Sequence, residues 1–274
     1  MKIATQILLV SLLFTSCASQ LGKVLKSKDN EYKLKMAEQF YAAKKYDKAQ
    51  QVFDDIFPYF KGTERYEDMF YKYCYCAYYQ GDYISSENLF KTYTENFPSS
   101  NRVEECDYMR AYSFYKQSPK VDLDQTNTSK TISLMQAFIN THPGSTRNAE
   151  ATNIIDQCRQ KLELKEWKSA QLYFDLGYFK AAAVAFGTLI DDYPDSEKGD
   201  AYKLDEIKSY FKYAQNSITD KQEERYQKVI TECGDFGDRF PDSKLKTDVE
   251  TYKTQSINIL NKLQNEQAKT STQR

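Results

Sequence analysis

The stretch GYFKAAAVAFGTLIDDYPDS, residues 177–196, decides the fold. It opens with a glycine and closes on a Tyr-Pro-Asp-Ser turn. Between them, apolar residues spaced by three or four share one face of a helix: Phe179, Ala182, Phe186 and Leu189. That helix ends before Pro194, because the residue preceding a proline avoids the α region. We therefore predict a glycine turn, an amphipathic helix, and a second turn that leads into another helix.

The closing turn recurs along the chain, with its prolines 45, 51 and 47 residues apart: Pro98, Pro143, Pro194 and Pro241. The residues before Pro98 keep the same offsets as those before Pro194: Gly81, Tyr83, Ser86, Phe90 and Tyr93. The serine two places after each proline is predicted to be the N-cap of the next helix. Such helix pairs are typical of tetratricopeptide repeats, whose basic period is about 34 residues. The sequence predicts an all-α superhelix of about five pairs, with the first helix of each pair lining a concave surface.

The repeats and their flanks divide the chain into five segments. Long spacings between the prolines indicate an inserted loop at 117–127 and extended helices over 147–176. The polar C-terminus is predicted to be disordered. The expected segments are a signal peptide (1–16), a lipidated linker (17–29), repeats one to three (30–143), extended helices with repeats four and five (144–263) and a tail (264–274).

The N-terminus has the pattern of an export signal. Lys2 precedes the apolar run ILLVSLLF at 7–14, which is too short to span a bilayer permanently. The run leads into Phe14-Thr15-Ser16-Cys17, which resembles a bacterial lipobox whose cysteine is lipidated. An ordinary secretory signal that happens to contain a cysteine is the alternative. By resemblance to Gram-negative lipoproteins, the residues after Cys17 permit export to the outer membrane, and the missing acidic run favours its periplasmic face.

Composition argues against an enzyme, a cofactor site and nucleic-acid binding. The formal net charge is −1, so no basic excess favours nucleic acid. With one histidine and no nucleotide-binding or Cys–His motif, the sequence predicts no catalytic centre and no metal site. The remaining cysteines are interpreted as small buried residues at helix contacts: Cys74, Cys76, Cys106, Cys158 and Cys233.

A row of tyrosines is the candidate binding feature. Tyrosine combines a rigid apolar ring with a hydroxyl that can meet backbone groups, which suits peptide capture. The repeat register places six of them on the groove side of the first helices: Tyr71, Tyr75, Tyr78, Tyr108, Tyr112 and Tyr115. The alternative is that these rings only pack between helices, since the chain holds 23 tyrosines.

The mature chain resembles the BamD-type outer-membrane assembly lipoproteins. The resemblance rests on the short linker after Cys17, the five repeats and the segment from Leu162 to Ser196. That segment is similar to the family's pattern of Leu and Glu, a Tyr-rich run, Gly-x-Tyr, paired alanines and Tyr-Pro-x-Ser. Phe179 stands where the family usually has tyrosine, and the fifth unit has extra residues at 216–224.

The resemblance implies a lipid-anchored scaffold of the β-barrel assembly machine. Its C-terminal repeats would dock the periplasmic domains of the barrel-forming assembly protein, and its N-terminal repeats would engage unfolded outer-membrane proteins. An extended substrate ending in an aromatic residue would suit the tyrosine row. The rival interpretation is another repeat lipoprotein acting in glycan binding or cell-wall coordination. Against this rival, the chain has only Trp167 and shows no sustained heptad pattern.

Overall fold

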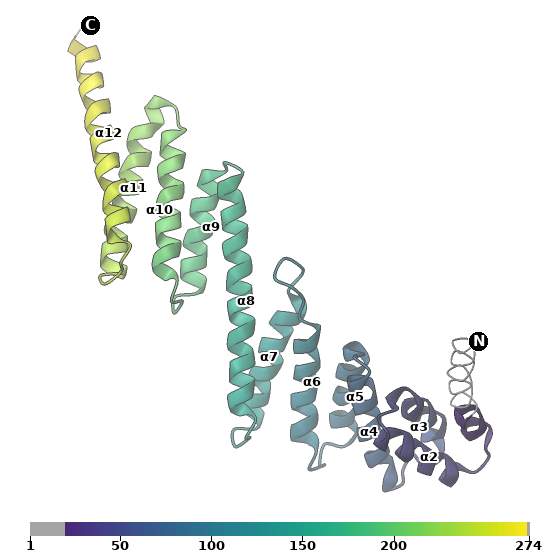
Figure 1. Cartoon of the computed structure of the whole chain (residues 1–274). Helices are drawn as coiled ribbons and strands as arrows, with labels where there is room; N and C mark the ends of the chain where they lie inside the picture. Colours follow the sequence, from purple (N-terminus) through teal and green to yellow (C-terminus); the bar gives the residue numbers. More distant parts are fainter. Residues whose placement is uncertain (1–19, 273–274) are drawn as a thin grey trace, which may run out of the picture. The chain divides into compact units, whose positions relative to one another are not determined.

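The computed structural model describes residues 20–272, and side chains as far as residue 266 (Figure 1). Every regular element in this range is a helix. The chain forms two compact units that divide inside a helix, after Cys158. The repeats alone suggested a division at 143/144, before that helix begins. The predicted signal peptide and Cys17 lie outside the described residues.

In unit 1, a short helical segment at 20–26 precedes a series of helix pairs in which successive helices pack on each other. Its helices are α2 (Asn30–Ala42), α3 (Tyr46–Phe60), α4 (Arg65–Tyr79), α5 (Tyr83–Asn96), α6 (Val103–Gln117), α7 (Thr126–Thr141) and the first part of α8 (Asn148–Asp175). The loop between α6 and α7 is the predicted insertion, and α8 is the predicted extended helix. These pairs confirm the all-α repeat architecture.

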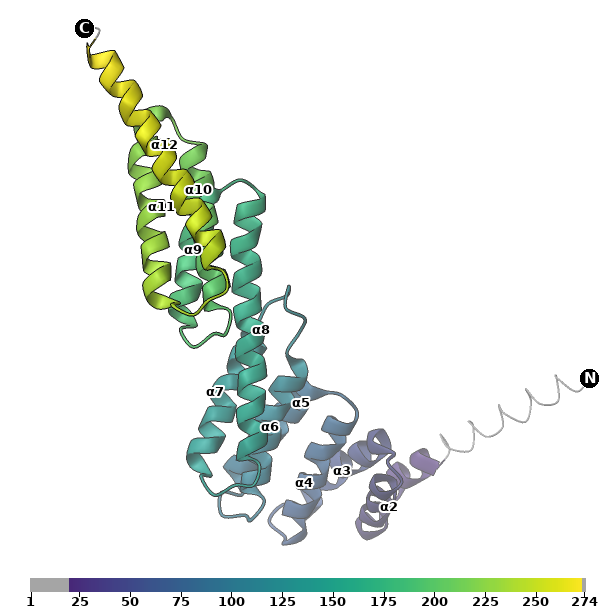
Figure 2. The same ribbon diagram turned by 60° about the vertical axis from the view of Figure 1, so that its left-hand side comes forward.

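Unit 2 continues the same alternation. It contains the rest of α8, α9 (Phe179–Asp192), α10 (Gly199–Gln215), α11 (Thr219–Arg239) and α12 (Lys246–Thr272). Figures 1 and 2 both show α9, α10 and α11 side by side, and α10 also packs against α12. The structure extends α12 to Thr272, although the polar composition after residue 263 had suggested a disordered tail.

In three of the helix pairs, the turn between the two helices contains one residue in the left-handed region. Gly81 and Gly177 both have φ of 79°, and Lys44 takes the same place in the first pair with φ of 57°. At all three positions the next residue's N–H returns to a carbonyl five residues back, as in the Asp82 to Ala77 bond of 3.1 Å. A glycine is favoured here because it has no Cβ to clash in this conformation.

The serine of each Pro-x-Ser turn has a different role from the predicted N-cap. Helix α6 begins at Val103 with Arg102 as its N-cap residue, two places after Ser100. The Ser100 hydroxyl accepts a hydrogen bond from the Arg102 N–H at 3.1 Å and donates to Glu67 of α4 at 2.6 Å. The same Ser–carboxylate bridge recurs at the next three turns: Ser145 to Glu104, Ser196 to Glu163 and Ser243 to Asp200. Each bridge therefore ties the start of one first helix to the first helix before it.

The helix faces predicted from the repeat form the cores. Phe90 and Tyr93 in unit 1, and Phe186 and Leu189 in unit 2, have at most 1% of their surface exposed. Burying such a side chain contributes about 1.5–3 kcal/mol. All five described cysteines are buried, as the sequence predicted.

Candidate functional site: a tyrosine strip on the first helices

Tyrosine rings in contact with one another run across α2, α4 and α6 of unit 1, with Tyr46 at the start of α3 linking α2 to α4. Tyr46 stacks on Tyr79 with ring centroids 4.6 Å apart, and Tyr78 reaches Tyr112 of the next first helix at 6.3 Å. We call this set the tyrosine strip, and its members are Tyr41, Tyr46, Tyr71, Tyr75, Tyr78, Tyr79, Tyr108, Tyr112 and Tyr115. It contains all six tyrosines proposed from the sequence. The repeat register therefore brought together rings from helices that are more than 20 residues apart.

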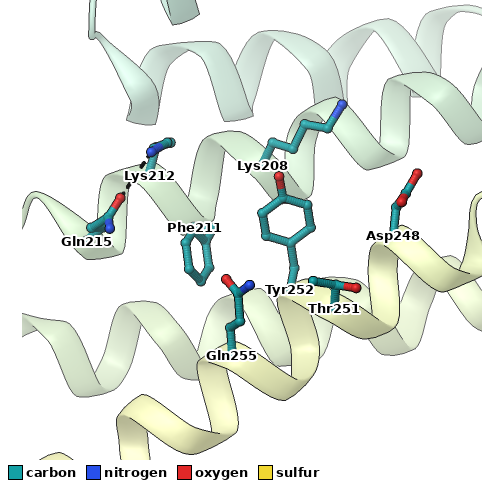
Figure 3. Close-up of a pocket in the computed structure, with 8 residues that line it drawn as sticks. All are labelled: Lys208, Phe211, Lys212, Gln215, Asp248, Thr251, Tyr252 and Gln255. Carbon is teal, nitrogen blue, oxygen red and sulfur yellow. Dashed lines mark hydrogen bonds between the residues drawn. The ribbon is translucent and has the colours of Figure 1, made fainter.

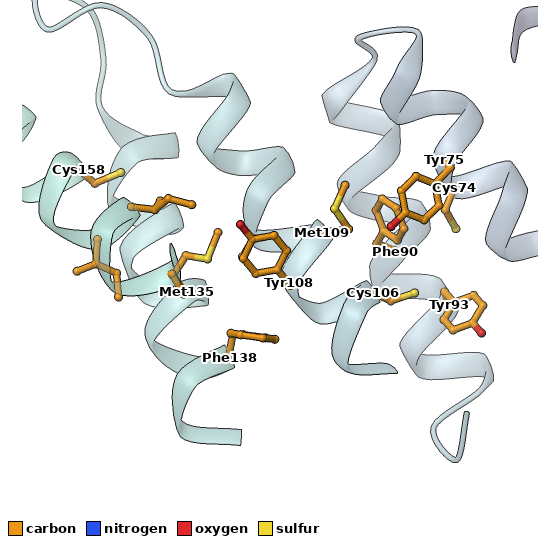
Figure 4. Packing of buried hydrophobic residues seen from close by; sticks show 14 of the residues in the cluster. Cys74, Tyr75, Phe90, Tyr93, Cys106, Tyr108, Met109, Met135, Phe138 and Cys158 are labelled. Carbon is orange, nitrogen blue, oxygen red and sulfur yellow. The ribbon is translucent and has the colours of Figure 1, made fainter. Parts of the chain in front are cut away.

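Two of the six belong to the core beneath the strip. Tyr75 is 8% exposed and Tyr108 is 2% exposed. Figure 4 shows both rings among buried side chains such as Phe90, Met109 and Phe138. So little exposure leaves them almost no area for a ligand, so they support the surface from below. Tyr71, Tyr78, Tyr112 and Tyr115 are partly buried and keep one side open, and Tyr79 is 51% exposed.

Glu105 of α6 anchors one end of the strip. Its carboxylate accepts hydrogen bonds from the Tyr71 hydroxyl at 2.8 Å and the Tyr75 hydroxyl at 2.6 Å. Burial, together with these bonds to Glu105, raises the pKa of both tyrosines well above the usual range. Both hydroxyls therefore stay protonated and are already engaged within the protein. They are not free to bind the backbone of a peptide.

Two arginines cover rings at the same end. The Arg102 guanidinium lies 4.3 Å from the centre of the Tyr71 ring, and Arg147 lies 4.6 Å from that of Tyr108. Such cation–π contacts contribute about 0.5–1 kcal/mol at exposed sites and more where water is excluded. Arg147 also pairs with Glu105 at 3.5 Å. These contacts fix the rings in place.

The other end of the strip has hydroxyls with no partner in the described chain. Tyr78, Tyr79 and Tyr112 form no hydrogen bond there, whereas the Tyr115 hydroxyl donates to Gln157 at 2.7 Å. Burial raises the pKa of Tyr78 to about 12, so its hydroxyl is a donor at neutral pH. Open ring faces beside free hydroxyl donors can bind apolar side chains and backbone carbonyls at the same time. This arrangement suits binding and includes no nucleophile–base pair.

The repeat analysis did not find Glu105, Arg102 or Arg147. The arginines had a signal in the sequence, because both stand two places after the serine of a Pro-x-Ser turn. At that position their N–H groups bond to the serine, which aims both side chains at the adjacent tyrosines. Glu105 had no comparable signal, because its partners lie 30 and 34 residues before it.

Unit 2 has a cluster of exposed apolar side chains where α8 turns into α9. Leu172, Leu176 and Tyr178 are each more than half exposed. Tyr173 and Val184 extend this cluster, which we call the α8–α9 patch, on the same two helices. Exposed large apolar side chains that lie near one another in this way are candidates for an interaction surface. Within residues 20–272, no helix is long and apolar enough to cross a membrane.

The fold defines an all-α helical-repeat protein, and comparison with known proteins places it in a family. Residues 27–209 match the YfiO family, described as outer membrane lipoprotein. The match covers more than half of the chain, so the chain belongs to this family of BamD-type outer membrane lipoproteins. The resemblance stated from the sequence is thereby confirmed.

Two individual proteins are also similar. A putative outer membrane protein assembly factor BamD from Aquifex aeolicus (strain VF5) is 26% identical over 129 residues, which make up 46% of this chain and 42% of that protein. The matched part is thus less than half the length of that relative. A solved structure of the TPR2AB domain of yeast Sti1 in a pHSP90 complex aligns with a TM-score of 0.40 and 12% identity, covering 83% of this chain and 98% of that one.

Proposed function

We propose that this chain is a non-enzymatic, lipid-anchored scaffold for the assembly of outer-membrane β-barrel proteins. Unit 1 binds segments of unfolded outer-membrane proteins on the tyrosine strip. Unit 2 docks the periplasmic domains of the barrel-forming assembly protein through the α8–α9 patch. Family membership and the BamD-named relative support the general role. The proposal for substrate binding rests on the end of the strip formed by Tyr78, Tyr79 and Tyr112, whose hydroxyls have no partner in the described chain.

The proposed lipid anchor is an acyl modification of Cys17. Acylation there would hold the mature chain on the periplasmic face of the outer membrane, because each buried methylene of an acyl chain contributes about 0.8 kcal/mol. Two or more chains make such attachment stable. Mass spectrometry of the N-terminal peptide tests this step, since a mature peptide that begins elsewhere than at acylated Cys17 would exclude the anchor.

The strip suits an unfolded barrel strand for physical reasons. A strand of a membrane barrel alternates lipid-facing apolar side chains with polar ones. An extended segment can therefore place its apolar side chains on the rings of Tyr78, Tyr79 and Tyr112. Its carbonyl groups then accept hydrogen bonds from the free hydroxyls of the same residues. Because stacking and backbone bonding require no specific sequence, one surface can serve many substrates.

The test is a binding measurement with a synthetic strand peptide from a barrel protein, labelled with fluorescein. Tyr79→Ala and Tyr112→Ala should each weaken binding about five- to thirtyfold, because truncating a ring at an interface costs about 1–2 kcal/mol. Tyr59→Ala is the matched control, since Tyr59 is 65% exposed but lies on α3, outside the strip. Unchanged affinity in folded Tyr79 and Tyr112 variants would remove the strip from the proposal.

A further inference from the structure

A pocket in unit 2 shares no residue with the tyrosine strip or with the α8–α9 patch. It is open to solvent, has a volume of about 570 Å³ and lies between α10 and α12 (Figure 3). That volume is within the range of ligand sites, about 300–1,000 Å³. Four residues of each helix line it: Lys208, Phe211, Lys212 and Gln215 from α10, and Asp248, Thr251, Tyr252 and Gln255 from α12.

The floor of the pocket is aromatic. Phe211 and Tyr252 meet edge to face, with ring centroids 5.2 Å apart, and Phe211 is buried. Figure 3 shows the two rings in the middle of the pocket, with polar side chains around them. Because each ring is held by its own helix, the floor is formed before any ligand arrives. A large apolar side chain would gain contact there without rearranging the core.

The charges on the rim are unequal. Lys208 is paired with Asp205 of its own helix at 3.0 Å. Lys212 is exposed, and its hydrogen-bond partner in the described chain is the neutral amide oxygen of Gln215 at 3.1 Å. Asp248 stands at the opposite end of the pocket (Figure 3). Lys212 is therefore the cation of this rim that has no carboxylate beside it.

We propose that this pocket binds an extended acidic segment of a partner protein in which an aromatic residue and a glutamate or aspartate stand two positions apart, so that both side chains lie on the same face of the segment. The aromatic ring rests on Phe211 and Tyr252. The carboxylate accepts a hydrogen bond from Lys212 and replaces the Gln215 oxygen. A charge-assisted bond of this kind is stronger than the neutral one it displaces.

The remaining rim residues determine which end of the pocket receives the carboxylate. Asp248 repels a carboxylate at the far end, so the acidic residue must lie toward Lys212. The side-chain amides of Gln215 and Gln255 each offer a donor and an acceptor, which match the N–H and C=O groups of an extended backbone. At the Lys212 end, the pocket thus favours a carboxylate over a basic side chain.

The probe is the fluorescein-labelled peptide Ser-Gly-Phe-Thr-Glu-Thr-Gly-Ser with blocked ends, titrated with the full chain in detergent micelles. A second labelled peptide, used for comparison, has glutamine in place of the glutamate. Fluorescence anisotropy should show the acidic peptide binding about fivefold more tightly, as expected for one solvent-accessible ion pair. K212Q should abolish this preference, K212R should retain it, and the matched control Lys221→Gln, an exposed lysine on α11, should leave it unchanged.

Three results would overturn the proposal. The first is equal affinity of the wild-type chain for the two peptides. The second is loss of the acidic preference in Tyr112→Ala, which would place the site on the tyrosine strip instead. The third is a dimer in sedimentation analysis that dissociates in K212Q, which would make a second copy of this chain the occupant. Circular dichroism confirms that each variant is folded.

Discussion

At the scale of single residues, three left-handed positions show how the repeat tolerates variation. Gly81 and Gly177 occupy two of them and Lys44 the third. A side chain in this conformation costs roughly 1–2 kcal/mol relative to glycine. Glycine recovers only part of that, because it also gives the unfolded chain more freedom. The first helix pair therefore carries strain that the second and fourth pairs avoid.

Exchanging the residues at these positions should change stability in opposite directions. We expect Lys44→Gly to raise the free energy of unfolding by about 0.5 kcal/mol and Gly81→Ala to lower it by about 1 kcal/mol. A Cβ on Gly81 would meet no atom within 4 Å, so its cost is conformational and not a clash. Urea unfolding followed by circular dichroism measures both. If Lys44→Gly destabilised the chain, the Lys44 side chain would have a stabilising contact that outweighs the strain.

At the scale of helices, a buried charge network joins α10 to α11. Lys203 is 2% exposed and pairs with Glu206 at 2.9 Å, with Asp235 at 2.6 Å and with Glu232. Hydrogen bonds to Asp235 and Glu232 raise the pKa of Lys203 despite its burial, so the lysine stays charged throughout the neutral range. Burial raises the pKa of Glu206. Lys203 is thus the buried cation of the network, and Lys228 adds a second, more exposed cation that pairs with Glu232 at 2.5 Å.

Removing the buried cation should be costly, and the cost should depend on pH. Lys203→Met leaves Glu206 and Glu232 buried without it, so we expect a loss of about 3–5 kcal/mol at neutral pH. A carboxyl whose pKa is raised in the folded state stabilises that state at low pH and loses this effect as the pH rises through the folded pKa. The loss in free energy of unfolding of the variant, relative to the wild-type chain, should therefore become smaller as the pH falls from 7 to 5.

Fluorescence of the single tryptophan, Trp167, reports the unfolding of unit 2 directly. Adding Glu206→Gln and Glu232→Gln to Lys203→Met should restore part of the stability and remove most of the pH dependence. If the loss of stability in Lys203→Met did not change with pH, the destabilisation would come from lost packing and not from unpaired charge.

The sequence predicted the helices better than the contacts between them. Spacings of three and four identified the helix faces, and each proline identified the end of a helix, because these are local properties. Whether a tyrosine is buried depends on the neighbouring repeat. Periodicity placed Tyr71 and Tyr75 on the groove side alike, and Glu105, about 30 residues away, determines what their hydroxyls bind. The role of Ser100 was missed for the same reason, since its partner Glu67 lies on another helix.

At the scale of the whole molecule, the proposed function assigns the two surfaces to different compact units. The tyrosine strip belongs to unit 1 and the α8–α9 patch to unit 2, and they share no residue. Substrate binding and docking should therefore be separable by mutation. A scaffold with one shared surface would lose both activities together.

Leu176→Asp tests this separation. A charge in the middle of an apolar contact is left desolvated and unpaired, so the barrel assembly protein should no longer co-purify from detergent-solubilised membranes. Ile84→Asp is the matched control, because Ile84 is equally prominent at 67% exposed but lies on α5 in unit 1. Leu176→Asp should still bind the strand peptide, and Tyr112→Ala should still co-purify with the barrel assembly protein. If Leu176→Asp lost peptide binding while remaining folded, or if Ile84→Asp lost co-purification equally, the assignment of one partner to each unit would be wrong.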